Sequence, residues 1–269
     1  MSGHAETAHA KLNLALHVRE RMADGYHRIE TVFAFCEDGD ELTAEKADSL
    51  SLETTGPFAG SIDSTDNLVV QAAEAFQRAN KTQAGASLRL RKLLPVASGL
   101  GGGSADAAAT LRLLNHLWGL NRPPDRLQSV GRQLGADVAA CIRSETVRGD
   151  GRGDELSPVE ENLSGTPVLL VNPRVELSTA EVFARWDGTD RGKLTGWMNG
   201  RNDLQRAAAS LAPQIDGVLA WLSVQAGADC VRMSGSGASC FALFENEAQR
   251  DRAATAVPRE WWRLATRLR

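Results

Sequence analysis

The sequence has little that points to a secreted or membrane-bound protein. It contains four cysteines in 269 residues, Cys36, Cys141, Cys230 and Cys240, and no C-x-x-C pair. This spacing suits neither a disulfide framework nor a zinc finger, so we expect buried thiols. No apolar run approaches the roughly 18 residues of a membrane span, and the N-terminus, residues 1–11, lacks a signal-peptide core. We expect a cytoplasmic protein without a membrane partner.

Charge and metal-binding residues also form few informative patterns. The net charge of −4 gives no general attraction to nucleic acid, so we expect no nucleic-acid partner. The five histidines are scattered without metal-ligand spacing. A chain of 269 residues with 42% hydrophobic residues can form one large or two medium domains. These features favour a globular protein that binds small molecules.

The most distinctive stretch is a glycine-rich loop between a strand expected over 87–94 and a helix expected over 105–118. Glycine lets the backbone approach a ligand, and a helix start presents unpaired N–H groups and the positive end of the dipole. We therefore expect a phosphate-binding loop. A flexible linker is the alternative, although linkers are seldom placed between a regular strand and a regular helix. The loop comprises Pro95, Val96, Ala97, Ser98, Gly99, Leu100, Gly101, Gly102, Gly103, Ser104 and Ala105.

Two common phosphate loops do not fit this stretch. The Walker A pattern requires Gly-Lys-Ser/Thr at its end, and no lysine follows Gly103. The dinucleotide fingerprint requires Gly-x-Gly-x-x-Gly, whereas the spacing here is Gly99, Gly101 and Ser104. We expect a different class of phosphate-binding protein.

Two charged residues lie in unusual places. Lys11 and Asn13 share the polar face of an alternating strand expected over 9–18, although Lys11 taken alone is most simply a solvated strand lysine. Asp137 lies among small apolar residues, where a buried carboxylate requires partners. Taken alone, it could equally cap a helix.

A helix expected over 68–79 would be capped by residues 66–67.

The second half of the chain gives weaker patterns. A glycine- and charge-rich stretch over 147–155 suggests a turn near a domain boundary, which gives an N-terminal domain over 1–149 and a C-terminal domain over 150–269. The segment 230–244 is typical of two strands joined by a glycine turn over 234–239. This turn either approaches the same phosphates or is a plain hairpin turn.

Three short motifs together resemble those of the GHMP kinases: residues 10–14, 95–105 and 234–239. The resemblance implies an α+β fold with an N-terminal α/β domain, a C-terminal ferredoxin-like domain and the active site in the cleft between them. It also implies an ATP-dependent kinase that uses Mg²⁺ with its ATP. Two mild departures are Ala139, where relatives often carry proline, and a third motif without the threonine of some members.

Further segments over 24–27, 66–68, 114–118 and 134–138 resemble GHMP kinases that act on a cytidine diphosphate alcohol. The implied reaction is phosphorylation of the erythritol 2-hydroxyl in the non-mevalonate isoprenoid precursor pathway. The alternatives are another GHMP kinase, for mevalonate, homoserine or a sugar, and a non-catalytic nucleotide-binding module. The aromatic ring and imidazole of Tyr26 and His27 suit a nucleobase and favour the first interpretation.

The resemblance also implies roles for single residues. Asp137 is expected to be the catalytic base and Lys11 the cation beside it, while Asn13 holds the substrate alcohol. Tyr26 and Phe183 are expected to stack on the cytosine and His27 to bind its edge, with a core position as the alternative for Phe183.

Expected ATP contacts are the loop over 95–105 together with Asn67 and Lys92. Ser104 is a candidate ligand for Mg²⁺, whose position the sequence leaves open. We expect a monomer or a weak homodimer.

Overall fold

The computed structural model describes residues 4–62 and 67–269. The chain divides into two compact units, and neither is one continuous stretch. Unit 1 contains Met1–Ala10, Asp38–Val96 and Gly102–Ser144. Unit 2 contains Lys11–Glu37, Ala97–Gly101 and Glu145–Arg269. The last change of unit therefore falls between residues 144 and 145, close to the boundary predicted from composition.

Two long strands each contribute residues to both units, which is why the units differ from the predicted domains 1–149 and 150–269. Strands β1 (His4–Arg21) and β2 (His27–Ala47) pair with each other. The sequence predicts shorter strands over 9–18 and 29–35 and a separate strand over 41–46. In the structure β2 runs through the acidic stretch as well, because the carboxylate of Asp40 is buried and accepts hydrogen bonds from the backbone N–H groups of Leu93 and Leu94.

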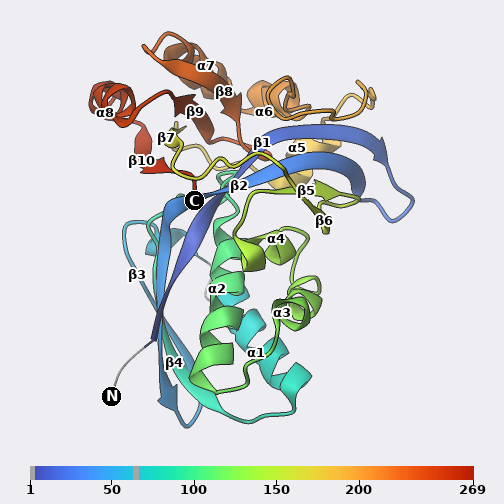
Figure 1. The fold of residues 1–269 in the computed structure, drawn as a ribbon, viewed down its shortest axis with the longest axis vertical. Helices are drawn as coiled ribbons and strands as arrows, with labels where there is room; N and C mark the ends of the chain where they lie inside the picture. Colours follow the sequence, from blue (N-terminus) through green and yellow to red (C-terminus); the bar gives the residue numbers. More distant parts are fainter. Residues whose placement is uncertain (1–3, 63–66) are drawn as a thin grey trace. The chain divides into compact units, whose positions relative to one another are not determined.

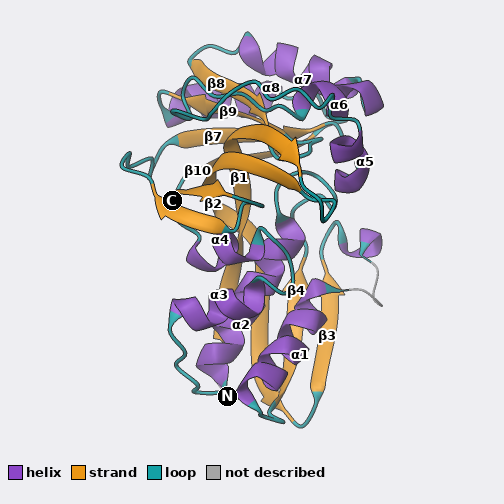
Figure 2. Ribbon diagram, turned by 90° about the vertical axis from the view of Figure 1, so that its right-hand side faces the viewer, coloured by secondary structure: helices purple, strands orange, loops and turns teal. Residues whose placement is uncertain are grey.

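In unit 1, helices lie against one face of a small sheet (Figures 1 and 2). Strand β4 (Gly85–Arg91) pairs antiparallel with β2 and parallel with β3 (Leu50–Thr55). The remaining elements are η1 (Ala59–Ser61), α1 (Leu68–Asn80), α2 (Gly102–Leu117), α3 (Pro124–Gly131) and α4 (Val138–Arg143). Buried alanines in the first half of α2 let its neighbours pack closely. This helix begins about three residues earlier than predicted.

Unit 2 contains a four-stranded antiparallel sheet in the order β10-β7-β9-β8. Its strands are β7 (Pro167–Asn172), β8 (Ala228–Met233), β9 (Cys240–Phe244) and β10 (Trp262–Arg267). The helices are α5 (Thr179–Ala184), α6 (Gln205–Leu211), α7 (Gln214–Ser223) and α8 (Glu247–Ala256). Helices α7 and α8 pack on the sheet (Figure 2). The stretch over 147–155 contains the predicted turn, at residues 151–154, and this turn joins β5 (Val147–Asp150) and β6 (Glu155–Pro158) into a hairpin.

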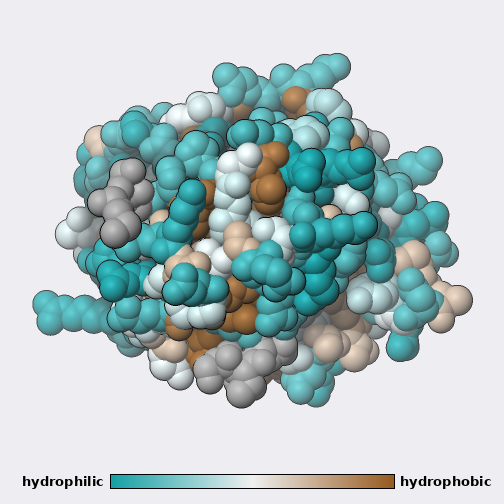
Figure 3. Space-filling model, turned by 90° about the horizontal axis from the view of Figure 1, so that it is seen from below, coloured by the Kyte–Doolittle hydropathy of each residue, from teal (hydrophilic) through white to brown (hydrophobic). Residues whose placement is uncertain are grey.

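Burial follows the hydrophobic pattern. All four cysteines are buried thiols, as predicted. In the view of Figure 3, hydrophilic residues cover most of the visible surface, and hydrophobic residues form smaller areas between them. None of the helices in the described ranges is long and apolar enough to span a membrane.

Candidate active site

Lys11 is buried on β1, and its side chain is only 3% exposed. Its ammonium group donates a hydrogen bond of 2.7 Å to Oδ1 of Asn13 and lies 5.3 Å from the centroid of the Phe33 ring. A buried lysine needs such partners, because removing an ammonium group from water is costly. The structure therefore excludes the simple alternative of a solvated strand lysine.

Asn13 is held from several sides within unit 2. Its Nδ2 donates to Oγ1 of Thr31 at 2.8 Å, and Thr31 in turn donates to the carbonyl of Ala15 at 2.6 Å. Its backbone N–H donates to Oγ of Ser234, which donates to the carbonyl of Gly99. These bonds fix the orientation of the Asn13 amide, with its oxygen toward Lys11. The first and third sequence motifs thus meet the start of the glycine-rich loop.

The first half of the glycine-rich loop has an alternating backbone. Ala97, Gly99 and Gly101 have positive φ angles of 48°, 79° and 63°. Alternation of this kind forms concave backbone nests that bind anions. The carbonyl groups of residues 97–100 accept hydrogen bonds within unit 2, from the backbone N–H groups of Leu177, Ser239 and Lys11 and the hydroxyl of Ser234. The hydrogen bonds to these four carbonyl groups therefore fix the conformation of the loop.

The turn over 234–239 packs directly on this loop. A Cβ atom built on Gly99 would clash with the carbonyl oxygen of Ser234, and one built on Gly235 would lie 3.0 Å from the carbonyl oxygen of Gly99. Asn202 donates from Nδ2 to the carbonyls of Met233 and Gly235, both at 2.8 Å. The turn is therefore more than a plain hairpin connection, because it supports the glycine-rich loop.

The second half of the loop starts α2 in unit 1, above a buried group of three charges. The ammonium of Lys92 lies 2.5 Å from Oδ2 of Asp40 and 2.5 Å from Oδ2 of Asp106. All three side chains are at most 5% exposed. A Cβ atom built on Gly102 would lie 3.0 Å from the Lys92 ammonium. The structure thus gives Lys92 two carboxylate partners beneath the helix start, and its direct contact with ATP stays a prediction.

Within this group of two carboxylates and one ammonium, Asp106 has a raised pKa. Burial and the nearby charge of Asp40 raise the pKa of Asp106 to about 7, against the lowering effect of Lys92. For Lys92, burial lowers the pKa, but the charges of Asp106 and Asp40 raise it more. Oδ1 of Asp106 has no hydrogen-bond partner among the described residues.

Asp106 is expected to make stability depend on pH. Between about pH 4, the ordinary pKa of aspartate, and about pH 7 the folded protein binds more protons than the unfolded chain. The free energy of unfolding should therefore fall as the pH rises through this window, with a slope of at most about 1.4 kcal/mol per pH unit. Melting temperatures at pH 5 and pH 8 should show a smaller difference in Asp106→Asn than in the parent. Asp125→Asn, an exposed aspartate of α3, is the matched control. Equal pH dependence in the parent and Asp106→Asn would contradict this assignment.

Asn67 lies where the sequence predicts it, at the start of α1. Its Oδ1 accepts a capping hydrogen bond of 2.8 Å from the N–H of Val69. Asp66, the other predicted capping residue, lies outside the described residues. The Leu68 side chain lies 3.2 Å from a Cβ built on Gly103, so the starts of α1 and α2 are neighbours.

A cavity of about 350 Å³ adjoins the start of α1 in unit 1. Its walls are mainly apolar, and its volume lies at the lower end of the range for small-molecule sites, about 300–1,000 Å³. The lining residues are Leu50, Ser51, Leu52, Thr54, Ala59, Ile62, Asn67, Val70 and Leu88. The cavity can therefore hold a flat apolar group beside the side-chain amide of Asn67.

Asp137 directly precedes α4 in unit 1 and is half-buried. Its backbone is in the right-handed helical region, with φ −74° and ψ −17°. Over the residues that the structure describes, its side chain makes no capping hydrogen bond to α4. Asp137 therefore occupies the N-cap position that the alternative predicts, but without a side-chain capping hydrogen bond among the described residues.

Two sets of ring contacts lie in another part of unit 2, one at His27 and one at Tyr26. The His27 ring lies 4.9 Å from the Phe183 ring and 5.6 Å, edge to face, from the Trp186 ring. Tyr26 is 55% exposed, and the guanidinium carbon of Arg152 lies 5.0 Å from its ring centroid. Aromatic faces and an arginine plane are the groups on which nucleobases stack. The structure thus brings His27 and Phe183 into contact, and Phe183 also packs against the hydrophobic core of unit 2, as its alternative predicts.

The environment of His27 favours its neutral form. Burial lowers its pKa, and the positive charge of Arg21 lowers it further. A neutral imidazole carries one donor and one acceptor, so it can match either kind of group on the edge of a base.

Several residues of these sites were not predicted from the sequence. The sequence around Trp186 and Arg152 shows no pattern that indicates a binding site, because an aromatic residue near a helix end and an arginine between glycines are common. Asp106 could have been found, since it lies in an apolar alanine-rich segment just as Asp137 does. Its partner Asp40 lies in an acidic stretch that resembles an exposed turn.

Two family models match the chain over much of its length. The model described as GHMP kinases N terminal domain matches residues 67–145, and the model described as GHMP kinases C terminal matches residues 183–264. The matches define the class of protein: an α+β kinase with an N-terminal and a C-terminal GHMP domain. Members of this class are ATP-dependent phosphotransferases.

Relatives with high sequence identity indicate one family within the GHMP kinases. A protein of Rhizorhabdus wittichii named 4-diphosphocytidyl-2-C-methyl-D-erythritol kinase is 51% identical, over 98% of this chain and 94% of that protein. A protein of Novosphingobium aromaticivorans with the same name is 49% identical, over 98% and 92%. A crystal structure of 4-(cytidine 5'-diphospho)-2C-methyl-D-erythritol kinase has a TM-score of 0.85 at 30% identity and covers 98% of this chain and 99% of that chain. The chain belongs to the GHMP kinases and, within them, to the family of the 4-diphosphocytidyl-2-C-methyl-D-erythritol kinases.

Proposed function

We propose that this protein transfers a phosphoryl group from ATP to the erythritol 2-hydroxyl of 4-diphosphocytidyl-2-C-methyl-D-erythritol, in the non-mevalonate isoprenoid precursor pathway. The relatives that share 51% and 49% of its residues carry the name of this kinase. The predicted alternatives, a kinase for mevalonate, homoserine or a sugar and a non-catalytic module, are less well supported by these relatives.

The group of aromatic rings around His27 carries this proposal. Phe183 and Trp186 contact the neutral imidazole of His27, and Tyr26, which precedes His27 in the chain, adds a third ring with the Arg152 guanidinium beside it. A small acid or a sugar has no flat aromatic group to stack on these rings, whereas cytosine has both a flat face and a hydrogen-bonding edge. Tyr26, Phe183 and His27 are therefore proposed as the cytidine-binding residues, with Arg152 and Trp186 beside them.

We propose that the adenine of ATP binds in the cavity beside Asn67 and that its phosphates bind at the start of α2. The N–H groups of Gly102, Gly103 and Ser104 belong to the first turn of this helix, where N–H groups have no partner within the helix. Lys92 is proposed to act from below, because its ammonium is close to Gly102 and held by two carboxylates.

We propose that Asp137 accepts the proton of the substrate hydroxyl as the phosphoryl group is transferred. An alcohol is a weak nucleophile until its proton is removed, and a carboxylate close to the hydroxyl can accept it. Lys11 is proposed to offset the charge on the transferring group, and its hydrogen bond to Asn13 holds the ammonium in one direction. Asn13 is proposed to help hold the alcohol.

Mg²⁺ is proposed as the partner of the ATP phosphates. No group of three or more metal-binding side chains occurs in the described ranges, which suits an ion held chiefly by phosphate oxygens. The half-buried hydroxyl of Ser104, in the first turn of α2, fits as a protein ligand. When bound, Mg²⁺ would neutralise charge on the transferring phosphoryl group. A cytoplasmic location and a monomer or weak homodimer complete the proposal.

Product formation from ATP with a panel of alcohols tests the proposal. The panel contains the cytidine diphosphate alcohol, mevalonate, homoserine and galactose. Turnover of the first alone is expected. Preferred turnover of another alcohol would assign the protein to another GHMP kinase, and ATP binding without any turnover would indicate a non-catalytic module.

Tyr26→Ala should weaken binding of the cytidine substrate. Stacking of a base on an aromatic ring is worth about 1–3 kcal/mol, so its KM should rise by about 5- to 150-fold. Tyr26→Phe keeps the ring and is the matched control, with a KM within a few fold of the parent. Steady-state kinetics at saturating ATP measure both. An unchanged KM in Tyr26→Ala would remove Tyr26 from the base site.

A further inference from the structure

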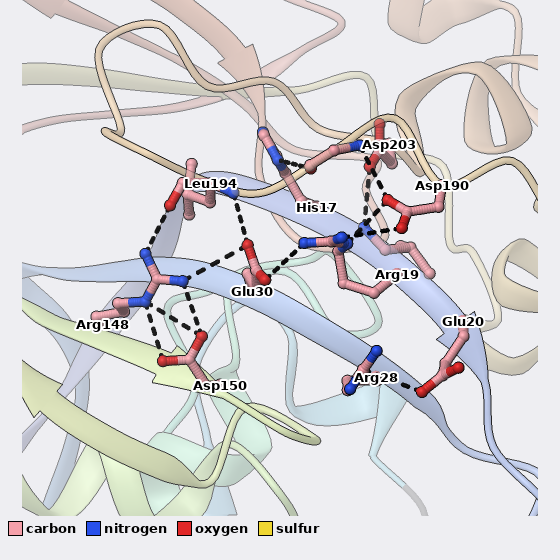
Figure 4. Close-up of polar contacts among 12 residues, drawn as sticks. His17, Arg19, Glu20, Arg28, Glu30, Arg148, Asp150, Asp190, Leu194 and Asp203 are labelled. Atoms are coloured by element: carbon pink, nitrogen blue, oxygen red, sulfur yellow. Dashed lines mark hydrogen bonds and ion pairs between the residues drawn. The ribbon is translucent and has the colours of Figure 1, made fainter.

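Glu30 is the centre of a group of polar contacts within unit 2 (Figure 4). Its Oε1 accepts from Arg19 at 2.7 Å, and its Oε2 accepts from the backbone N–H of Leu194 at 2.5 Å. Oε2 also lies 3.5 Å from the guanidinium of Arg148. We refer to these contacts and their acidic partners as the Glu30 network, which comprises Arg19, Glu30, Arg148, Asp150, Asp190 and Leu194.

The two arginines extend the network outward. Arg19 binds Asp190 through two hydrogen bonds of 2.8 and 2.9 Å, the paired geometry that gives an arginine–carboxylate contact its direction. Arg148 binds Asp150 at 2.9 Å and donates to the carbonyl of Leu194 at 2.7 Å. Arg19 and Glu30 are only 13% and 15% exposed, so solvent screens their pairing less than that of a surface ion pair.

The network joins the same three parts of unit 2 that supply the proposed base site. Glu30 lies on β2, three residues after His27. Asp150 ends β5, two residues before Arg152. Asp190 lies four residues after Trp186, in the segment that follows α5. Each part therefore contributes one residue to the network and, within four residues along the chain, one residue to the proposed base site.

We propose that Glu30 is a positioning residue for the cytidine end of the substrate. By holding β2, the β5–β6 hairpin and the segment after α5 together, it sets the spacing of the rings before the base enters. Parts that are already in place lose less conformational freedom on binding, which increases affinity without any direct contact to the ligand. This inference rests on the proposed function.

Glu30→Ala tests it by steady-state kinetics with both substrates. A hydrogen bond to a charged group contributes enough that its loss is worth about tenfold or more. The KM for the cytidine diphosphate alcohol should rise by about tenfold, while kcat and the KM for ATP stay within about threefold. Glu30→Gln keeps an acceptor for Leu194 and should recover part of the loss. Glu37→Gln, which breaks the exposed pair of Glu37 with Arg267, is the matched control and should change neither KM.

Each other outcome is decisive. An unchanged KM for the cytidine substrate in folded Glu30→Ala would overturn the positioning role. A fall in kcat together with a rise in both KM values would also overturn it, because this pattern indicates general loss of structure. If Glu30→Ala does not fold, Arg19→Lys takes its place, since lysine cannot form the paired contact with Asp190. A parent protein that turns over a different alcohol would overturn the proposed function and this inference with it.

Discussion

Asp137→Asn is expected to lower kcat by at least about a hundredfold while ATP still binds. The amide has the size of the carboxylate but cannot accept the proton of the substrate hydroxyl. The half-buried Asp137 directly precedes α4, so its catalytic role stays a prediction that this variant tests. A structural role would instead reduce stability and leave the rate of the remaining folded protein unchanged.

Lys11→Met should give a loss of similar size. Methionine keeps an apolar stem next to Phe33 but removes the ammonium that donates to Asn13. Single-turnover phosphoryl transfer, with protein saturated by both substrates, separates chemistry from binding for both variants. Asp125→Asn, in the first turn of α3, is the control carboxylate and should keep the parental rate. A rate within a few fold of the parent in Asp137→Asn would remove Asp137 from the mechanism.

Gly102→Val should raise the KM for ATP by at least about tenfold or abolish binding. A Cβ at this position lies 3.0 Å from the Lys92 ammonium and 3.6 Å from Oδ2 of Asp40. The ammonium cannot move away easily, because two carboxylates hold it. The branched side chain must therefore displace the first turn of α2, whose N–H groups are proposed to bind the phosphates.

Binding of ATP to Gly102→Val is measured by calorimetry, with the melting temperature as the test of folding. Gly217→Val places the same side chain in α7, where no described atom beyond the adjoining helix backbone lies within 4 Å of the added Cβ, and should bind ATP as the parent does. The KM for the cytidine substrate serves as a second control. If folded Gly102→Val binds ATP with parental affinity, the phosphates do not bind at this helix start.

Local patterns in the sequence predicted many of the secondary-structure elements. The alternation around Lys11, the capping by Asn67 and the glycine turn after Met233 are features of a few neighbouring residues, and all three are found in the structure. The helix α8 and the strand β10 were not predicted, because their residues show little periodicity that distinguishes a buried face. The length of β2 depends on the burial of Asp40, which only tertiary contacts can favour.

The candidate site was predictable where a motif is continuous in sequence. The loop over 95–105 has its glycines at the positions where the backbone has positive φ or approaches a neighbour closely. Trp186 and Arg152 reach the rings of His27 and Tyr26 from distant segments, and no spacing in the sequence encodes such a contact. The pairing of Asp137 with Lys11 stays a prediction that the mutants above test.

The interleaving of the two units has a consequence for synthesis on the ribosome. All three stretches of unit 1 have been made once residue 144 is added, so this unit can complete its structure while the rest of the chain is still being translated. Unit 2 begins with residues 11–37 but needs residues up to 269, so its early strands must wait through most of translation for their partners. A nascent chain stalled just after residue 144 has left the ribosome should therefore resist protease within unit 1 and be cleaved within residues 11–37.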